Sequence, residues 1–334
     1  MQFTLSAMRR RFALPAPSLG AEAGADGWLV REEAIMGTAI RVELWCDDRD
    51  DAESAAAAVM AEMHRIDRLL SPYKEDSELS LINREAARRA VPVGAETMRL
   101  LARAVQFSEM SGGAFDITYA SLGHLFDYRL GIRPSEAATL HARQAIGWQH
   151  LILDSKAGTV RFARQGVRID LGGFAKGHAV DNCVAILEQH GIAQAIVSAG
   201  GDSRVLGDRR GRPWTIAIRD PRRSDGVVAV LPLEDVSIST SGDYERYFEE
   251  GGVRFHHLID PHTGESPSGI RSVTILAPDG LTSEALSKTV FVLGAKRGFE
   301  LVESLPDVDA VVVDAAGVLR FSPGLLHGAS ARLQ

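Results

Sequence analysis

The chain has 334 residues, of which 45% are hydrophobic and 24% are charged, a composition typical of globular proteins. Its formal net charge of −7 argues against a nucleic-acid partner held by a basic field. Two cysteines, Cys46 and Cys183, are too few for a disulfide framework or a Cys-only zinc site, and free buried thiols are expected. No window holds the roughly 20 apolar residues of a membrane span, so none is expected.

The first residues are rich in alanine, glycine and proline. We expect residues 1–27 to be a flexible lead-in and residues 28–330 to form a single domain. A short charged and apolar stretch near Met8 is interrupted by two prolines, and no lipid-accepting cysteine follows it. This pattern is a poor export signal.

The first half of the domain predicts a strand and then helices. Residues 38–45 alternate polar and apolar side chains, the period of a half-buried strand. Residues 52–70 have helical periodicity, and residues 71–83 are predicted to be a polar loop. A helix over residues 95–111 ends at a glycine pair, and a further helix is expected near residues 134–145.

The second half changes to short strands joined by turns rich in glycine, aspartate and proline. Strands are predicted at residues 150–153, 159–162, 167–171, 195–198, 214–219, 227–231, 237–240, 273–276 and 310–314. Helices are predicted at residues 175–190 and 283–305. Because helices and strands are intermixed without strict alternation, the pattern predicts an α+β fold rather than a doubly wound α/β fold.

The most informative segment runs from Ile169 to Asp181. A strand leads into the turn at Gly172 and Gly173, and the turn opens a helix. Glycine allows close approach of backbone N–H groups to a ligand, and a helix N-terminus suits a diphosphate, to which Lys176 adds a positive charge. A tight packing turn with an exposed lysine explains the same pattern. The spacing matches neither a P-loop nor a dinucleotide fingerprint.

Three other segments combine turns with polar side chains. Residues 113–118 place an aromatic and a carboxylate after a helix end, and residues 239–246 place hydroxyls after a strand. Residues 256–264 carry three histidines, but their spacing fits no standard zinc motif. A single histidine is more often a packed or surface residue than a catalyst, so each segment alone is weak evidence.

Taken in chain order, these segments resemble the motifs of the ApbE family, the FAD:protein FMN transferases. The resemblance covers about residues 35–320. It is carried by residues 36–38, 67–73, 77–83, 113–116, 170–181, 199–202, 240–244, 257–261 and 291–294. Each motif is short, and their common order makes the resemblance specific.

The resemblance implies an ApbE-like, T-fold-like α+β domain. Two mixed or antiparallel sheet halves, flanked by helices, would bind FAD in a cleft between them. It also implies a Mg²⁺-dependent reaction in which FMN moves from FAD to a threonine hydroxyl of an acceptor flavoprotein and AMP leaves.

The resemblance further implies roles for single residues. His257 matches the proposed catalytic histidine, and an imidazole with an ordinary pKa near ~6.5 suits a base for a threonine hydroxyl. Lys288 and Asp181 complete the expected catalytic set. FAD contacts are expected at Met36, Tyr73, Ala114, Phe115, Asp116, Gly173, Lys176, His178, Asp181, Ser241 and Ile259. The metal positions correspond to the carbonyl of Ala175 and to Glu284 and Lys288.

The chain departs from the family pattern at the last two positions. The family has Asp and Thr there, both oxygen ligands, whereas this chain has Glu284 and Lys288, which i, i+4 spacing keeps on one helix face. An ammonium has no lone pair and cannot bind Mg²⁺ while charged. Lys288 could replace the metal, turn aside while Mg²⁺ binds Glu284, or mark a damaged site. A helix-surface Glu–Lys pair is the plainer interpretation. We favour metal replacement, because the substitution puts a cation where a cation is needed.

Two other functions stay open from the sequence. One is an FAD-binding protein with little catalysis, which Lys288 motivates. The other is an FAD diphosphatase, in which water replaces the threonine. Related proteins are often exported lipoproteins, but without a lipid-accepting cysteine we expect a cytoplasmic location, with the periplasm as the alternative.

Overall fold

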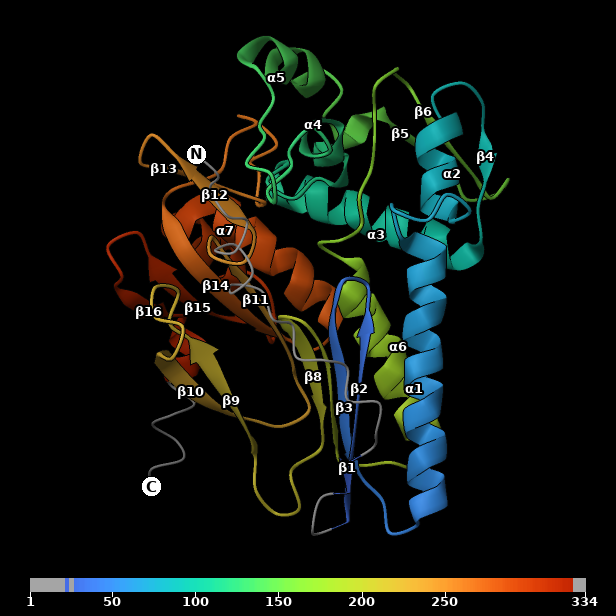
Figure 1. The fold of residues 1–334 in the computed structure, drawn as a ribbon, viewed down its shortest axis with the longest axis vertical. Helices are drawn as coiled ribbons and strands as arrows, with labels where there is room; N and C mark the ends of the chain where they lie inside the picture. The colour runs from blue at the N-terminus through green and yellow to red at the C-terminus, as the bar shows by residue number, and fades with distance from the viewer. Residues whose placement is uncertain (1–21, 24–26, 327–334) are drawn as a thin grey trace, which may run out of the picture.

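The centre of the fold is one nine-stranded sheet (Figure 1). The structure is a computed structural model, and it describes residues 22–23 and 27–326; most of the expected lead-in lies outside this range. Every neighbouring pair of strands in the sheet is antiparallel. In spatial order the strands are β1 (Glu22–Ala23), β2 (Trp28–Ile35), β3 (Thr38–Trp45), β7 (Ala195–Ala199), β8 (Asp202–Leu206), β11 (Ser237–Gly242), β14 (Ile270–Ala277), β15 (Asp309–Asp314) and β16 (Leu319–Phe321).

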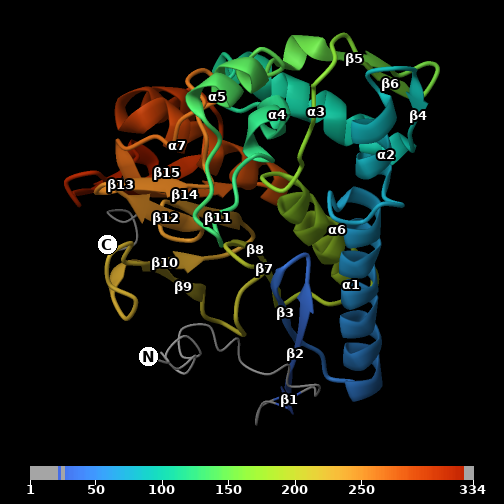
Figure 2. The same cartoon turned by 45° about the horizontal axis from the view of Figure 1, so that its top comes forward.

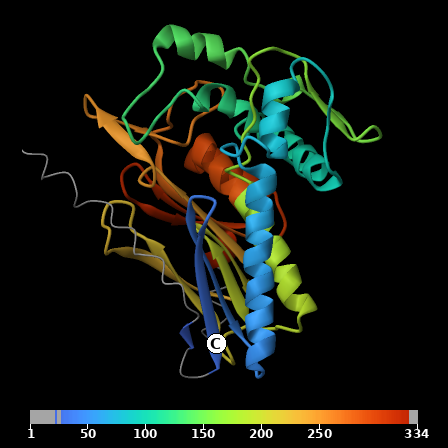
Figure 3. The ribbon, with the colours of Figure 1, turned by 45° about the vertical axis from the view of Figure 1, so that its right-hand side comes forward.

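Three long helices pack on one face of this sheet (Figure 3). They are α1 (Arg49–Leu70), α6 (Ala175–Gln189) and α7 (Gly280–Glu303). Asp48 caps the start of α1 by accepting hydrogen bonds from the backbone of residues 50 and 51. The buried side of α1 includes Val59, Met63, Ile66 and Leu70, which recur every three or four residues and so share one side of the helix. The main core lies between these helices and the sheet.

A separate hairpin covers part of the opposite face. It consists of β9 (Trp214–Arg219) and β10 (Val227–Leu233). Its buried side chains pack against the sheet in a second, smaller core. The two faces of the sheet are therefore covered differently, by helices on one side and a hairpin on the other.

The remaining elements form a cap at one end of the helices, at the top of Figures 1 and 2. The cap consists of α2 (Glu78–Glu85), α3 (Ala95–Ser111), α4 (Ala120–Gly123), α5 (Glu136–Arg143), the short helices at Ile117–Tyr119 and Trp148–His150, and a sheet of β4 (Val91–Pro92), β6 (Thr159–Phe162) and β5 (Leu151–Asp154). The hairpin of β12 (Tyr247–Glu250) and β13 (Val253–His256) lies beside it (Figure 2).

The predicted α+β fold is confirmed, and most predicted elements agree with the structure to within a few residues. The strands form one large antiparallel sheet and three small ones. The prediction of a loop over residues 71–83 is wrong in part, because α2 begins at Glu78. Ser77 caps this helix by accepting a hydrogen bond from the Ser80 backbone, a signal that the sequence contained.

The predicted strand over residues 167–171 is also wrong. This extended segment pairs with no strand among the described residues. Its backbone groups bond instead to the cap: Ile169 to the Asn83 side chain, Arg168 to Ser121 Oγ, and Asp170 to the Ile117 carbonyl. Hydrogen bonds to the cap, most of them to side chains, thus take the place of the bonds that a neighbouring strand would make.

Both cysteines are free thiols, and Cys183 is buried, as expected. Over the part of the chain that the structure describes, no helix combines the length and the apolar character needed to cross a membrane.

Candidate active site

The candidate site is built where α6 and α7 cross. A Cβ atom on Gly177 would overlap the backbone carbonyl of Gly280, so the two helices approach this closely only because both positions are glycine. The crossing brings Lys176, in the first turn of α6, against Glu284 and Lys288 of α7.

Four charged residues meet at this crossing and are called the charge cluster: Lys176, Asp202, Glu284 and Lys288. Lys176 Nζ lies 2.8 Å from Asp202 Oδ2 and also contacts Glu284 Oε1. Lys288 Nζ lies 3.3 Å from the same Glu284 oxygen. Glu284 is 0% exposed, which excludes a simple surface pair on the helix.

Three hydroxyls surround the acidic side of the charge cluster. Ser239 Oγ donates to Asp202 Oδ1 at 2.5 Å. Ser287 Oγ lies 3.1 Å from Ser239 Oγ and 2.8 Å from Ser241 Oγ. The site therefore joins β8, β11 and α7, and Ser241, a predicted site residue, is part of it.

The electrostatics of Lys176 and Asp202 favour their ionised forms. Burial lowers the pKa of Lys176, but the carboxylates of Asp202 and Glu284 outweigh this and raise it well above the ordinary value. Burial raises the pKa of Asp202, but the ammonium groups of Lys176 and Lys288 outweigh this and lower it. Lys176, which is partly exposed, and the buried Asp202 thus form an ion pair at neutral pH.

His257 follows directly after β13. Its backbone N–H donates to the Arg246 carbonyl at 3.0 Å, and its buried Nδ1 atom has no hydrogen-bond partner among the described residues. Burial, followed by the positive charges of Arg246, His256 and Lys288 in that order, lowers the pKa of His257 to about 3. The imidazole is therefore neutral at physiological pH.

Two turns that contain glycine bring the tip of the β2–β3 hairpin close to the charge cluster. Met36, at the tip of this hairpin, has a left-handed backbone with φ of 54°. The Gly200 N–H donates to the Ala39 carbonyl at 3.1 Å, and a Cβ on Gly200 would lie 2.7 Å from Thr38 Oγ1. The hairpin tip thus lies next to the turn between β7 and β8, which leads into Asp202.

Asp181 is held at the start of α7 rather than in the charge cluster. Its two oxygens accept hydrogen bonds from the backbone N–H groups of Gly280 at 2.7 Å and Leu281 at 3.0 Å. Arg204 also donates to it at 2.7 Å. Asp181 therefore anchors one helix to the other.

Other predicted site residues also have protein partners. His178 Nε2 lies 2.7 Å from Glu96 Oε1. The buried carboxylate of Asp116 accepts hydrogen bonds from Thr118 and from the Trp148 backbone. These residues shape the cap and its junction with α6.

The remaining predicted contacts differ in exposure. Tyr73 is 89% exposed, whereas Ala114, Phe115, Ala175 and Ile259 are buried. Phe115 packs within a group of aromatic rings that includes Phe174, just before α6. Gly173 lies against Lys288, since a Cβ on Gly173 would be 3.4 Å from Lys288 Cε. The glycine turn and Lys288 are thus direct neighbours.

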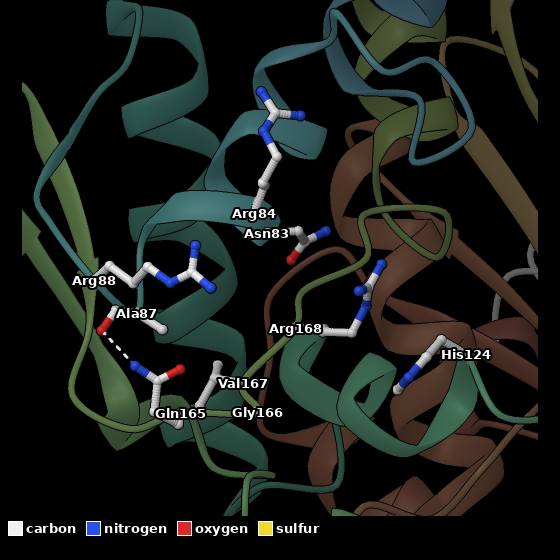
Figure 4. Close-up of a pocket in the computed structure, with 9 residues that line it drawn as sticks. All are labelled: Asn83, Arg84, Ala87, Arg88, His124, Gln165, Gly166, Val167 and Arg168. Atoms are coloured by element: carbon white, nitrogen blue, oxygen red, sulfur yellow. Dashed lines mark hydrogen bonds between the residues drawn. The ribbon is translucent and has the colours of Figure 1, made fainter.

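Two surface hollows lie in the cap and beside α6, and neither includes the charge cluster. One is lined by Arg84, Arg88, Arg168 and neutral groups around them (Figure 4). The other is lined by residues that include His178 and Asp181. Those two predicted residues therefore face a different surface from Lys176.

The sequence interpretation missed three residues of the site. Asp202 was part of a recognised motif but was given no role, although it follows a glycine pair at the start of a strand. Ser239 was part of a recognised segment but was given no role of its own, and Ser287 was not singled out. Ser287 lies three residues after Glu284 on the same helix, so helical spacing could have placed it beside the charge cluster.

The profile of the ApbE family matches residues 36–312. The FAD:protein FMN transferase of Treponema pallidum is 34% identical over 316 residues, covering 89% of this chain and 87% of that protein. The protein of the same name from Haemophilus influenzae is 34% identical over 281 residues, covering 80% and 81%.

Solved structures give the same result. The ApbE protein of Thermotoga maritima superposes with a TM-score of 0.83 at 34% identity, covering 90% of this chain and 98% of that one. The flavin transferase ApbE of Vibrio cholerae superposes with a TM-score of 0.78 at 26% identity, covering 90% and 97%.

Proposed function

The chain belongs to the ApbE family, and from this premise we propose how it acts as an FAD:protein FMN transferase. FAD is the substrate, and FMN passes to an acceptor flavoprotein. We assign the accepting group to a threonine hydroxyl. The observation that carries the proposal is the meeting of the glycine turn, the charge cluster and the start of α6 at one helix crossing.

We assign the role of general base to His257. Its imidazole is neutral, so it can accept the threonine proton, but the lowered pKa makes it a weaker base than an ordinary histidine. Because Nδ1 is buried and has no partner among the described residues, we assign the proton transfer to Nε2. The threonine oxygen then forms a bond to the FMN-side phosphorus. The bond from that phosphorus to the bridging oxygen breaks, and its electron pair leaves with AMP.

The diphosphate gains charge on its oxygens during this step, and positioned donors and cations stabilise that charge. We assign the diphosphate to the turn at Gly172 and Gly173. In support, α6 begins just after this turn, and its N-cap residue makes no side-chain hydrogen bond to it. A helix N-terminus of this kind can bind an anion.

We assign the flavin and adenine contacts to the surfaces around Met36, Tyr73 and Phe115. Tyr73 is 89% exposed, and an exposed aromatic ring can stack on a flavin or adenine ring. We assign Asp116 a positioning role, because its oxygens already hold Thr118 and the Trp148 backbone.

The proposal is tested by incubating the protein with FAD and an acceptor domain that carries the threonine. Covalent flavin fluorescence on a denaturing gel is expected. His257→Ala should slow transfer by about 10²–10⁴-fold while FAD binding, measured by calorimetry, is retained. His141→Ala, a change at an exposed histidine of α5, is the control and should transfer at the wild-type rate.

The same reaction separates the alternative functions. A transferase releases AMP only when the acceptor is present, whereas an FAD diphosphatase releases it without acceptor. A protein that only binds FAD releases none. Wild-type transfer by His257→Ala would refute the base assignment.

A further inference from the structure

Within the charge cluster, the two lysines differ in how many of their donors the protein uses. An ammonium has three N–H donors. Those of Lys176 are directed at the Gly172 carbonyl at 3.1 Å, at Asp202 Oδ2 at 2.8 Å and at Glu284 Oε1. Lys176 is therefore saturated and has no donor left for a ligand.

Lys288 is not saturated. Its Nζ atom lies 3.3 Å from Glu284 Oε1 and 4.0 Å from Asp202 Oδ1, and the second distance is too long for a hydrogen bond. The described residues thus engage one of its three donors. Its aliphatic chain lies against Gly173, so its ammonium is next to the turn assigned to the diphosphate.

The acidic residues of the charge cluster do not offer a free set of metal ligands. Glu284 Oε2 accepts from the Gly177 backbone at 2.7 Å, and Oε1 faces both lysines. Asp202 Oδ1 accepts from Ser239 Oγ, and Oδ2 pairs with Lys176. Across the described part of the chain, no three histidine, cysteine or acidic side chains gather as possible ligands.

Mg²⁺ prefers near-octahedral oxygen coordination, and a charged ammonium supplies no lone pair. To bind beside Glu284 and Asp202, the ion would have to displace both lysines and enter a region whose two negative charges are already matched by two positive ones. The donor set therefore does not fit Mg²⁺, although the family resemblance implies that metal.

We propose that the Lys288 ammonium supplies the positive charge that stabilises the FAD diphosphate during transfer, in place of a divalent cation. Lys176 is then a positioning residue that fixes Asp202 and Glu284, and Glu284 in turn holds Lys288. This inference rests on the proposed function. It keeps the metal replacement by Lys288 that the sequence favoured, and it changes the role of Lys176, which was expected to contact the diphosphate.

The first test is FMN transfer by metal-stripped protein in excess EDTA. The rate should equal that measured with added Mg²⁺. Lys288→Met, which keeps the aliphatic chain, should lower the rate by about 10²–10³-fold, with no recovery on adding Mg²⁺. Lys296→Met changes an exposed lysine of the same helix and should leave the rate unchanged.

The second test measures the metal directly and does not depend on transfer. Without FAD, the wild-type protein should bind no Mn²⁺ at this site in an electron paramagnetic resonance titration. The double variant Glu284→Asp, Lys288→Thr restores two oxygen-bearing side chains on this face, so it should bind Mn²⁺ and should transfer FMN only when a divalent cation is added.

Two results would overturn the inference. One is loss of wild-type transfer in EDTA with recovery on adding Mg²⁺. The other is wild-type Mn²⁺ binding that Glu284→Gln abolishes. If instead no covalent flavin forms under any condition, with or without Mg²⁺, the proposed function fails, while the Mn²⁺ titration still decides whether this site takes a metal.

Discussion

At the scale of single residues, the state of His257 gives a prediction about pH. Burial and neighbouring cations lower its pKa to about 3, from an ordinary value near ~6.5. The base should therefore stay neutral as the pH falls through 6.5. We expect kcat/KM for transfer to show no loss with a midpoint near 6.5, and to fall only as the pH approaches about 3.

The same shift affects stability, and the two effects must be separated. Because the folded state disfavours the protonated imidazole, the unfolded state binds the proton first, and stability falls as the pH drops from about 6.5 toward 3. Initial rates should therefore be measured only where thermal unfolding shows folded protein. A rate midpoint near 6.5 in folded protein would contradict the assigned environment of His257.

A second prediction concerns Asp181, which the sequence comparison placed in the catalytic set. We assign it a structural role, because it accepts two backbone N–H groups at the start of α7 and pairs with Arg204. Asp181→Ala leaves these donors unpaired, and we expect a loss of about 1–3 kcal/mol in the free energy of unfolding.

Asp181→Asn is the matched control, because its amide oxygen still accepts one of these hydrogen bonds. It should lose less stability than the alanine variant. Denaturant unfolding and transfer rates of the folded fraction would be measured together. If Asp181→Asn keeps full stability but loses transfer, the residue acts in the chemistry after all.

At the scale of secondary-structure elements, the crossing of α6 and α7 sets the geometry of the site. A Cβ on Gly177 would overlap the Gly280 carbonyl. Gly177→Ala should therefore push the helices apart and cost about 1–3 kcal/mol of stability, and it should also separate Lys176 from Glu284 and slow transfer. Gly269→Ala, where an added Cβ meets no atom within 4 Å, should change neither property. Unchanged thermal unfolding of Gly177→Ala would contradict this account.

Helical periodicity and capping signals were enough to predict the long helices, because these depend on local spacing. The prediction of a strand at residues 167–171 was wrong because the structure of this segment does not depend on local spacing. Its apolar residues are buried, but its backbone partners are the side chains of Asn83 and Ser121, which are far away in sequence. Nothing local distinguishes such a segment from a strand in a sheet.

The sequence also predicted only those parts of the site that depend on local spacing or on known motifs. The family motifs named the segments that meet, and Glu284 and Lys288 could be paired from helical spacing alone. The involvement of Asp202 and the saturation of Lys176 depend on how β8 and α7 lie against α6. Those contacts join residues that are more distant in the chain. The sequence alone could favour Lys288 as the cation, but only the tertiary structure shows that the donors of Lys176 are already used.

At the scale of the whole molecule, the sheet holds the site elements together. The charge cluster is formed by residues of α6, β8 and α7, and β11 adds hydroxyls beside it. The cap adjoins the glycine turn through the bond from the Asp170 N–H to the Ile117 carbonyl. The β9–β10 hairpin packs on the opposite face. FAD bound at the site should therefore stabilise the cap and the helix layer together, without contact to that hairpin.

Hydrogen–deuterium exchange tests this arrangement. A ligand that binds only the native state suppresses local opening where it makes contacts. Saturating FAD should slow exchange together in residues 113–118, 170–177 and 254–258, which are separated along the chain, and leave residues 214–233 unchanged. Riboflavin, which lacks the diphosphate, is the control and should protect residues 170–177 less. Protection confined to the cap would mean that FAD does not reach the crossing of α6 and α7, and the assigned diphosphate position would be wrong.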